Sequence, residues 1–197
     1  MDYKDWKVKS FTVRPVDPAV AMPFIRENHY TRNTNGLNWE YCFGLYAGDT
    51  LIGAMIYGML SMRNAWKPYG DSPNDVIELK RLACIDATPK NTETYFIGHT
   101  LRWLARNTQY KRVVSYADPH FGHSGVIYRA SNFKYCGQTD KGRSVQVGNR
   151  LYHGKSLRTT YKGKLKAFAV RLLEQLANGE AQMVITEGKH IYTYDLC

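Results

Sequence analysis

The sequence has no long apolar run and no paired cysteines, and these absences argue against several classes of protein. No apolar stretch approaches the roughly 20 residues that a membrane-spanning helix needs, and no apolar leader opens the sequence. The four cysteines, Cys42, Cys84, Cys136 and Cys197, form no Cys-x-x-Cys pair, which argues against a zinc motif and a dense disulfide framework. We therefore expect a cytoplasmic protein in a reducing compartment, with no membrane partner.

Acidic residues are scarce relative to basic ones. The 197 residues include 27 Lys and Arg but only 17 Asp and Glu, so the formal net charge is +10. This surplus suits a polyanion, because each neutralised phosphate releases a condensed counterion. The charge alone fits a basic protein without nucleic acid equally well. No basic amphipathic helix supports an anionic membrane as the partner.

Linkers, internal repeats and low-complexity tracts are also missing, so we expect one domain over residues 1–197. Caps, turns and apolar periodicity predict an element order of β-α-β-β-β-α-β-α-β up to residue 136. The expected segments are a strand over 7–16, a helix from Asp17-Pro18, a hairpin over 39–60, a strand over 76–85, a helix over 92–106, a strand over 111–117, a helix over 124–131 and a strand over 133–136. Beyond these, we expect a helix over 169–176 and a hairpin that pairs 183–186 with 191–194.

Three stretches carry a resemblance to a known family. The first two are the pair His29-Tyr30 and the run Glu-Leu-Lys-Arg-Leu at 78–82; the third is Ser-Tyr-Ala-Asp-Pro-His-Phe-Gly-His-Ser at 115–124, continued by Gly-Val-Ile-Tyr-Arg-Ala-Ser-Asn-Phe at 125–133. Together they resemble the Mom family of phage DNA-modification proteins, within the GNAT acyltransferase-like superfamily. The fold this implies is α/β (α+β), with a central mixed, twisted sheet flanked by helices.

The resemblance also implies a reaction and a partner. The expected activity converts adenine in double-stranded phage DNA to N6-carbamoylmethyladenine, in an infected bacterial cell, and so protects the DNA from restriction. The target adenine has to be flipped out of the duplex. Two alternatives stay open: an N-acyltransferase acting on a protein or small amine, and a non-catalytic DNA-binding protein that blocks restriction. A homodimer is compatible with each.

The donor of the transferred group is open. Acetyl-CoA-dependent relatives hold the pyrophosphate with a glycine-rich, basic loop before a helix. The corresponding segment here, residues 86–93, has no glycine, one lysine and two acids, which argues against a conventional acetyl-CoA site. A simple acyl transfer would leave an amide on the base, whereas the product that the resemblance implies carries a methylene group on nitrogen. An aminoacyl-type donor and another small metabolite are both conceivable.

Asp118 and Arg81 are the first candidates for catalysis. Asp118 follows a buried strand, where ligands gather in open α/β sheets, and could act as the base; the alternative is a turn aspartate before Pro119. Arg81 lies in an apolar strand, where it must pair with an anion or point into a polar cavity. It could hold a carboxylate or phosphate of the donor, or form a structural ion pair with Glu78 or a more distant acid.

His29, Tyr30 and Ser115 complete the expected catalytic set. His29 could act as an acid or base and Tyr30 could stack on the flipped adenine, although loop histidines are more often solvated. Ser115 and Tyr116 alternate on one strand, so only one can face the site, and we favour Ser115.

The substrate-binding candidates follow directly after Asp118. They are His123, Ser124, which could cap the next helix, and Tyr128, which could instead belong to the core. The histidines His120 and His123 raise iron or zinc as an option, but their spacing in a turn does not favour a bound metal.

A basic segment over 141–166 is the expected DNA contact. The cations chosen for this role are Arg143, Arg150, Lys155, Arg158, Lys162 and Lys164, flanked by Lys141 and Lys166 and interleaved with Tyr152, His153 and Tyr161. Lysine and arginine would contact phosphates while aromatic rings stack on bases. A solvated basic face is the alternative.

Overall fold

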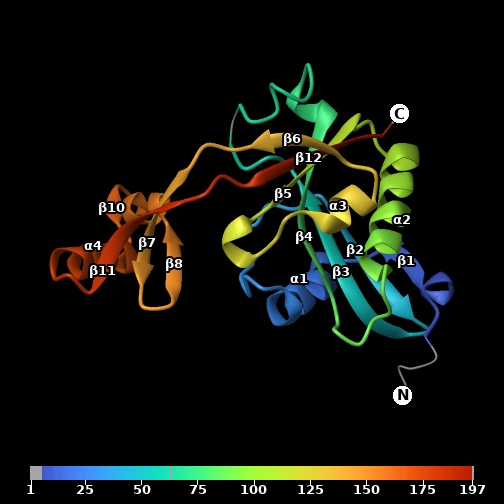
Figure 1. The fold of residues 1–197 in the computed structure, drawn as a ribbon, viewed down its shortest axis with the longest axis horizontal. Helices are drawn as coiled ribbons and strands as arrows, with labels where there is room; N and C mark the ends of the chain where they lie inside the picture. Colours follow the sequence, from blue (N-terminus) through green and yellow to red (C-terminus); the bar gives the residue numbers. More distant parts are fainter. Residues whose placement is uncertain (1–5, 63, 197) are drawn as a thin grey trace. The chain divides into compact units, whose positions relative to one another are not determined.

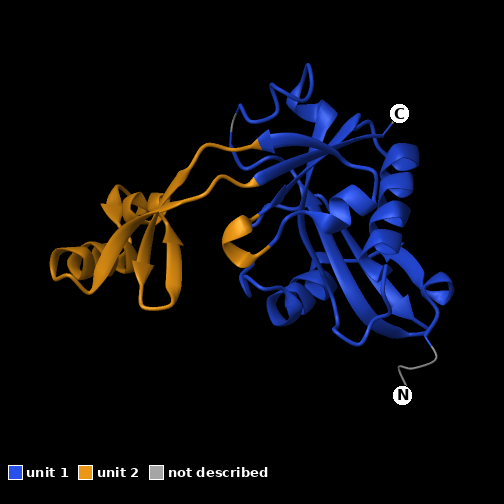
Figure 2. Ribbon diagram, viewed as in Figure 1, with its two compact units in different colours: residues 1–117, 123–137, 190–197 blue, residues 118–122, 138–189 orange. Residues whose placement is uncertain are grey.

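The computed structural model describes residues 6–62 and 64–196 and is shown in Figure 1. This part of the chain divides into two compact units (Figure 2). Unit 1 comprises the described residues up to 117 together with 123–137 and 190–196, and unit 2 comprises 118–122 and 138–189. The larger segment of unit 2, residues 138–189, is therefore an insertion between two strands of unit 1. Because such an insertion can still be part of one domain, a single domain stays a prediction.

Unit 1 is built on a mixed sheet, with seven strands among the described residues, in the order β1-β2-β3-β4-β5-β12-β6. Their bounds are β1 (Thr12–Pro15), β2 (Tyr41–Ala47), β3 (Thr50–Gly58), β4 (Val76–Cys84), β5 (Arg112–Ala117), β6 (Lys134–Gln138) and β12 (His190–Asp195). β4 and β5 run parallel, whereas β3 with β4 and β5 with β12 run antiparallel. The sheet confirms the predicted strands, except that the first begins at Thr12 after a short 3-10 turn at Val8–Ser10.

Helices cover both faces of this sheet. They are α1 (Pro18–Asn28), α2 (Thr92–Asn107) and α3 (Val126–Ala130). Ile25 of α1 packs with Ile56 of β3, whereas Phe96 of α2 packs in a cluster with Tyr57, the next residue of β3. Because successive strand residues point to opposite faces, α1 and α2 lie on opposite sides of the sheet. The start of α1 is as predicted, since the Asp17 carboxylate accepts a hydrogen bond from the backbone N–H of Ala19 at 2.7 Å.

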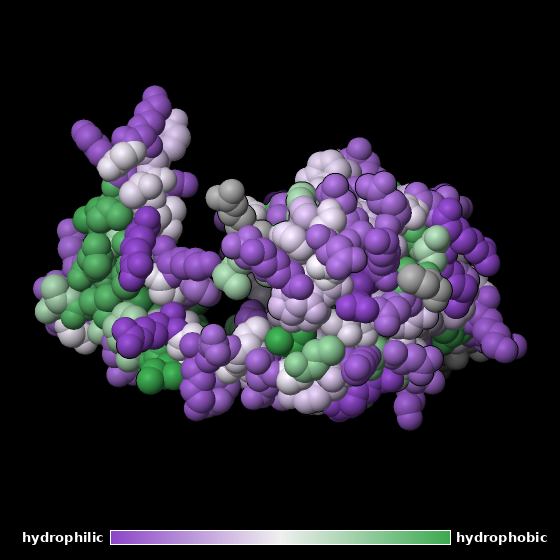
Figure 3. All heavy atoms as spheres, turned by 90° about the horizontal axis from the view of Figure 1, so that it is seen from above, coloured by the Kyte–Doolittle hydropathy of each residue, from purple (hydrophilic) through white to green (hydrophobic). Residues whose placement is uncertain are grey.

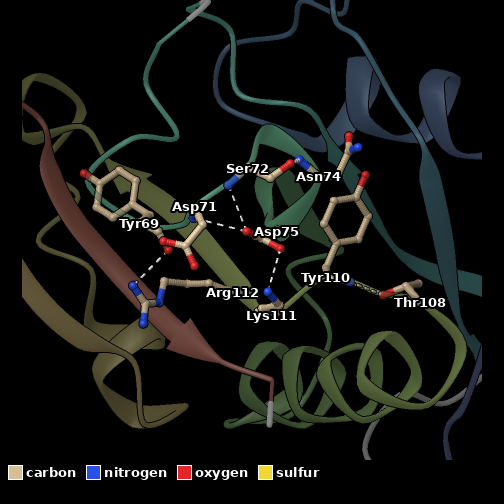
Figure 4. Close-up of polar contacts among 9 residues, drawn as sticks. All are labelled: Tyr69, Asp71, Ser72, Asn74, Asp75, Thr108, Tyr110, Lys111 and Arg112. Atoms are coloured by element: carbon tan, nitrogen blue, oxygen red, sulfur yellow. Dashed lines mark hydrogen bonds and ion pairs between the residues drawn. The ribbon is translucent and has the colours of Figure 1, made fainter.

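Polar contacts fasten the loop between β3 and β4 to the start of β5 (Figure 4). The Asp75 carboxylate accepts hydrogen bonds from the backbone N–H groups of Asp71 and Ser72 and pairs with Lys111 Nζ at 3.0 Å. Arg112 Nη1 donates to the carbonyl oxygen of Tyr69 at 2.9 Å. Residues 69–75 of this loop are thus tied to the sheet beside the parallel strand pair.

Unit 2 has its own small sheet, in the order β11-β7-β8, and a separate β9-β10 pair. The elements are β7 (Gly142–Val147), β8 (Arg150–His153), η5 (Gly154–Arg158), β9 (Thr160–Tyr161), β10 (Lys164–Leu165), α4 (Ala167–Ala177) and β11 (Ala181–Thr186). Val145, Leu172 and Ala181 form its buried cluster. Exposed apolar side chains also gather on this unit (Figure 3), among them Phe168, Leu173, Met183 and Ile185.

The predicted C-terminal hairpin is wrong. β11 pairs antiparallel with β7 in unit 2, and β12 pairs antiparallel with β5 in unit 1. The connection does not turn back on itself, because Gly188 and Lys189 run alongside Thr139. A Cβ on Gly188 would lie 1.8 Å from the Thr139 carbonyl oxygen, and the N–H of Thr139 donates to the carbonyl oxygen of Lys189 at 2.9 Å. No helix in the described part of the chain is long and apolar enough to cross a membrane.

Candidate functional site

The parallel strands β4 and β5 part halfway along their length. Their pairing ends with Leu79 opposite Ser115, whereas β4 stays paired with β3 as far as Cys84 and β5 stays paired with β12 as far as Ala117. At the last paired position, Ser115 Oγ donates to the carbonyl oxygen of Leu79 at 3.1 Å. Beyond this point the facing edges of the two strands are not joined to each other, and the candidate site lies beside this gap.

A β-bulge at Lys80 sets the direction of the next side chain, Arg81. Tyr57 of β3 pairs with Leu79 and Ile56 pairs with Arg81, so the ladder passes over Lys80. Ile56 belongs to the cluster that α1 covers. Because residues opposite each other in an antiparallel pair share a face, Arg81 lies on the α1 side of the sheet.

Arg81 is incompletely satisfied. Its Nη1 donates to the carbonyl oxygen of Lys80 at 2.6 Å, but its Nε is buried without a hydrogen-bond partner among the described residues. Glu78, the acid considered from sequence as its structural partner, pairs instead with Lys80 Nζ at 2.7 Å. A buried guanidinium donor left unpaired costs free energy, which an acceptor for this N–H would recover.

His29 caps the end of α1 and is buried, with 7% of its surface exposed; it is therefore not the solvated loop histidine of the alternative. Burial, then the charges of Arg81 and His123, lower its pKa from 6.5 to about 4. The ring is neutral at pH 7. Its Nδ1 accepts a hydrogen bond from the backbone N–H of Thr31 at 3.2 Å, so the proton of the neutral ring is on Nε2 and that nitrogen is a donor.

Three rings stand in a row beside Arg81. The centroids of His29 and Tyr30 are 4.2 Å apart, and those of Tyr30 and His123 are 4.5 Å apart. Tyr30 is 43% exposed, so part of its surface is open to a ligand. Tyr128 is buried in the core, where burial raises its pKa to about 12 despite a hydrogen bond with Ser115.

The structure thus brings six of the predicted residues into one neighbourhood of unit 1: His29, Tyr30, Arg81, Ser115, His123 and Tyr128. Ser124 is exposed, and Gly125 rather than Ser124 is the N-cap of α3, so the predicted capping role is wrong. The Ser124 carbonyl oxygen instead accepts from the hydroxyl of Tyr192 at 2.7 Å and from Arg129 Nη1 at 2.8 Å.

Asp118 belongs to unit 2 and has partners of its own. Its carboxylate accepts from the backbone N–H of His120 at 3.1 Å and pairs with Lys189 Nζ at 3.0 Å. The first contact is the turn role that Asp-Pro predicts. A catalytic role for Asp118 stays a prediction.

The DNA-binding candidates of unit 2 are all exposed: Arg143, Arg150, Lys155, Arg158, Lys162 and Lys164. Tyr161 is 65% exposed, and Lys162 Nζ lies 5.6 Å from its ring centroid. Tyr152, in contrast, packs against the cluster of Val145, so its ring is largely committed to the core of unit 2. His153 Nδ1 accepts from the backbone N–H of Lys155 at 3.1 Å.

Sequence reasoning missed the buried ion pair between Glu78 and Lys80. Their side chains are 14% and 2% exposed, and Lys80 Nζ also donates to Ser61 Oγ at 3.2 Å. Tyr116 lies near Glu78, and burial raises its pKa. A signal for the pair was present, because two charges of opposite sign two residues apart in an apolar strand face the same side.

The turn between β4 and α2 does not fit the pyrophosphate of CoA. Asn91 begins α2 with a φ of 70° and no side-chain cap, and Glu93 occupies the first helical turn. A carboxylate in the first turn would repel a phosphate bound at this helix N-terminus. We derive no chemistry through CoA for this chain.

Comparison with solved structures defines the fold class. A Bacillus subtilis acetyltransferase in complex with CoA aligns with a TM-score of 0.54 and 9% identity, over 95% of this chain and 99% of that one. The SpeG spermidine N-acetyltransferase of Vibrio cholerae aligns with a TM-score of 0.53 and 10% identity, over 95% of each chain. The chain therefore has the GNAT acetyltransferase fold, as the resemblance implied.

Sequence comparison identifies the family within that fold. Residues 10–197 match the Mom protein family, and the chain belongs to it. The methylcarbamoylase mom of Escherichia phage Mu is 25% identical over 174 residues, which cover 86% of this chain and 70% of the phage Mu protein.

Proposed function

We propose that this protein transfers a carbamoylmethyl group to the exocyclic amine of adenine in DNA. Membership of the Mom family and similarity to a methylcarbamoylase support group transfer. The observation that carries the proposal is the buried Nε of Arg81, which has no hydrogen-bond partner within residues 6–62 and 64–196 and lies beside the neutral ring of His29. These two groups offer N–H donors to a ligand at the gap between β4 and β5.

Arg81 holds an anionic group of the donor. A guanidinium presents its N–H groups in a planar fork that matches a carboxylate or phosphate. Nη1 already donates to Lys80, which fixes the plane of the fork, and Nε is left to the ligand. The donor is therefore an anionic small molecule or aminoacyl-type compound rather than a neutral one.

His29 and Tyr30 act on the acceptor and the transferred group. Nε2 of His29 donates a hydrogen bond to the carbonyl oxygen of the carbamoylmethyl group, whose methylene carbon is attacked. The exposed part of the Tyr30 ring stacks on the flipped adenine, as aromatic side chains do with extruded bases. Ser115, committed to Leu79 and Tyr128, positions Tyr128 and does not touch the reacting atoms.

The amine proton needs an acceptor. As N6 of adenine forms its bond to the methylene carbon, the bond from that carbon to the leaving group breaks and N6 loses a proton. We assign this proton to the Asp118 carboxylate, which directly follows β5 in the chain and forms an ion pair with Lys189. The exposed cations of unit 2 bind the DNA phosphates.

Variants separate these roles in cells that express the protein. Arg81→Ala and Asp118→Asn should each reduce modified adenine in cellular DNA by at least about a hundredfold, the usual loss when one transition-state contact is removed. Lys134→Gln, at an exposed position on β6, should leave modification unchanged. Melting curves and DNA binding of the purified variants show whether each still folds. Full modification by either variant removes that residue from the mechanism.

Two further measurements would each indicate a different function for this protein. Tight binding of acetyl-CoA in a calorimeter would indicate an ordinary N-acyltransferase, against the poor fit of the turn before α2. Protection of DNA from restriction enzymes with all of its adenine unmodified would indicate steric blocking by a DNA-binding protein.

A further inference from the structure

A second basic site lies on unit 1, between β1 and the C-terminal half of α2. The groove has a volume of about 280 Å³, close to the lower end of the range for small-molecule sites. Its floor is apolar and includes Val13, Phe43 and Trp103, and its rim carries His99, Arg102 and Arg106. β1 is separated from β4 by two strands of the sheet, so this groove is distinct from the candidate site at Arg81.

The rim concentrates positive charge without compensation. His99, Arg102 and Arg106 are spaced by three and four residues, so they form one stripe along α2. Neither guanidinium forms an ion pair with any described residue. Like charges four residues apart destabilise a helix. The helix dipole favours a cation in the last turn, which accounts for Arg106 but not for Arg102, and an anion bound between them would relieve the repulsion.

Trp103 gives the groove one partly exposed aromatic ring. The Trp103 ring packs edge-on against Phe43, with centroids 5.2 Å apart, and against Tyr41 at 5.5 Å. Both contacts fix the indole in place. Burial and then the charge of Arg102 lower the pKa of His99, so its neutral ring can exchange hydrogen bonds with a polar ligand without adding to the repulsion.

We propose that the groove between β1 and α2 binds a phosphate-bearing ligand. The guanidinium groups of Arg102 and Arg106 contact phosphate oxygens, and the part of the ligand attached to the phosphate lies on Trp103. The same chemistry is offered by a free nucleotide and by the backbone of a nucleic acid. The site does not depend on the proposed adenine modification.

Tryptophan fluorescence reports directly on this groove. The purified full-length protein is titrated with pyrophosphate, with adenosine diphosphate and with a short single-stranded oligonucleotide, and Trp103→Phe identifies the part of the signal that comes from Trp103. We expect a saturable change that is absent in Trp103→Phe. Saturation by adenosine diphosphate supports a nucleotide site, and saturation by the oligonucleotide alone supports a contact with a nucleic-acid backbone.

Variants of Arg102 and Arg106 test whether their charges determine the affinity for the ligand. Arg102→Gln/Arg106→Gln should weaken binding at least about tenfold, because two charge-assisted contacts are lost. Arg102→Lys/Arg106→Lys keeps the charge but not the planar fork and should fall in between. The matched control Lys9→Gln/Lys134→Gln removes two exposed cations elsewhere on unit 1 and should bind as the wild type does. Wild-type affinity in the glutamine double variant, or no fluorescence change with any of the three probes, overturns the proposal.

Discussion

The Lys80 ammonium and the Glu78 carboxylate form an ion pair at 2.7 Å that is almost wholly shielded from water. Lys80 is also the bulge residue of β4, and its carbonyl oxygen holds Nη1 of Arg81 at 2.6 Å. The ion pair therefore anchors the backbone on which the orientation of Arg81 depends. Charge burial of this kind carries a large desolvation cost, so each partner is needed once the other is present.

Replacement of Lys80 should change both the stability of the protein and the pKa of His29. Lys80→Met leaves Glu78 uncompensated and should lower the free energy of unfolding by about 3–5 kcal/mol. Because Arg81 helps to lower the pKa of His29, loss of its fixed position should raise that pKa from about 4 towards 6.5. Denaturant unfolding measures the first effect and an NMR titration of the His29 ring the second.

Two further variants serve as controls for the effect of Lys80→Met on the pKa of His29 and on stability. Arg81→Gln gives the His29 pKa in the absence of the guanidinium, and Lys80→Met/Glu78→Leu removes both charges and should recover part of the stability. If Lys80→Met is destabilised while His29 titrates as in the wild type, the ion pair stabilises the sheet without positioning Arg81.

The pKa of His29 also predicts how stability depends on pH. Well above pH 6.5 the ring is neutral in the folded and unfolded chain and contributes no slope. As the pH falls towards 4, the unfolded chain binds the proton first, because the folded-state pKa is lowered. The free energy of unfolding should therefore fall across this window, by roughly 2–3 kcal/mol from His29. His29→Gln should lose this part of the slope in urea titrations, whereas His120→Gln should retain it.

Gly125 should not tolerate a side chain. It has a φ of +72°, and a Cβ built on it would lie 2.3 Å from the ring of Tyr192, which is only 1% exposed. Gly125→Ala should lower the free energy of unfolding by about 2–4 kcal/mol. Gly122 has a φ of +75° with nothing within 4 Å of its Cβ position, so Gly122→Ala should cost only about 1 kcal/mol. Equal losses in thermal unfolding would show that the Tyr192 contact contributes nothing.

DNA binding should depend steeply on salt. If about six cations of unit 2 contact phosphates, affinity should fall roughly a thousandfold across a fourfold increase in salt concentration. Lys162→Gln/Lys164→Gln should reduce the slope of log K against log salt by about 2, whereas Lys9→Gln/Lys134→Gln should leave it unchanged. A flat dependence for the wild-type protein, measured by fluorescence anisotropy, would remove DNA binding from the account.

Local signals predicted the parts of the fold that local chemistry decides. Asp17 and Pro18 marked the start of a helix, and Arg81 was conspicuous as a charge within an apolar strand. The β-bulge at Lys80 was not predictable in this way, because it depends on pairing with β3. Regular alternation would have put Arg81 on the opposite face of the sheet.

The partners of β11 and β12 also could not be predicted from local sequence. Met183 and Tyr192 lie in apolar runs that are close in sequence, which favours a hairpin. Their partners are Val145 and Ser115, respectively, and these pairings become visible only when the whole sheet is assembled. Likewise, the sequence alone predicts Arg102 and Arg106 as solvated helix positions. The groove that they line is formed only when β1 packs beside α2.

The most direct test is tandem mass spectrometry of deoxyadenosine from the DNA of cells that express the wild-type protein. The account predicts a modified nucleoside whose added mass is that of a carbamoylmethyl group in place of one hydrogen, with the group on the base and bonded to nitrogen through a methylene carbon. Unmodified deoxyadenosine in cells containing abundant folded protein, or an N-acetyl amide on the base, would contradict it.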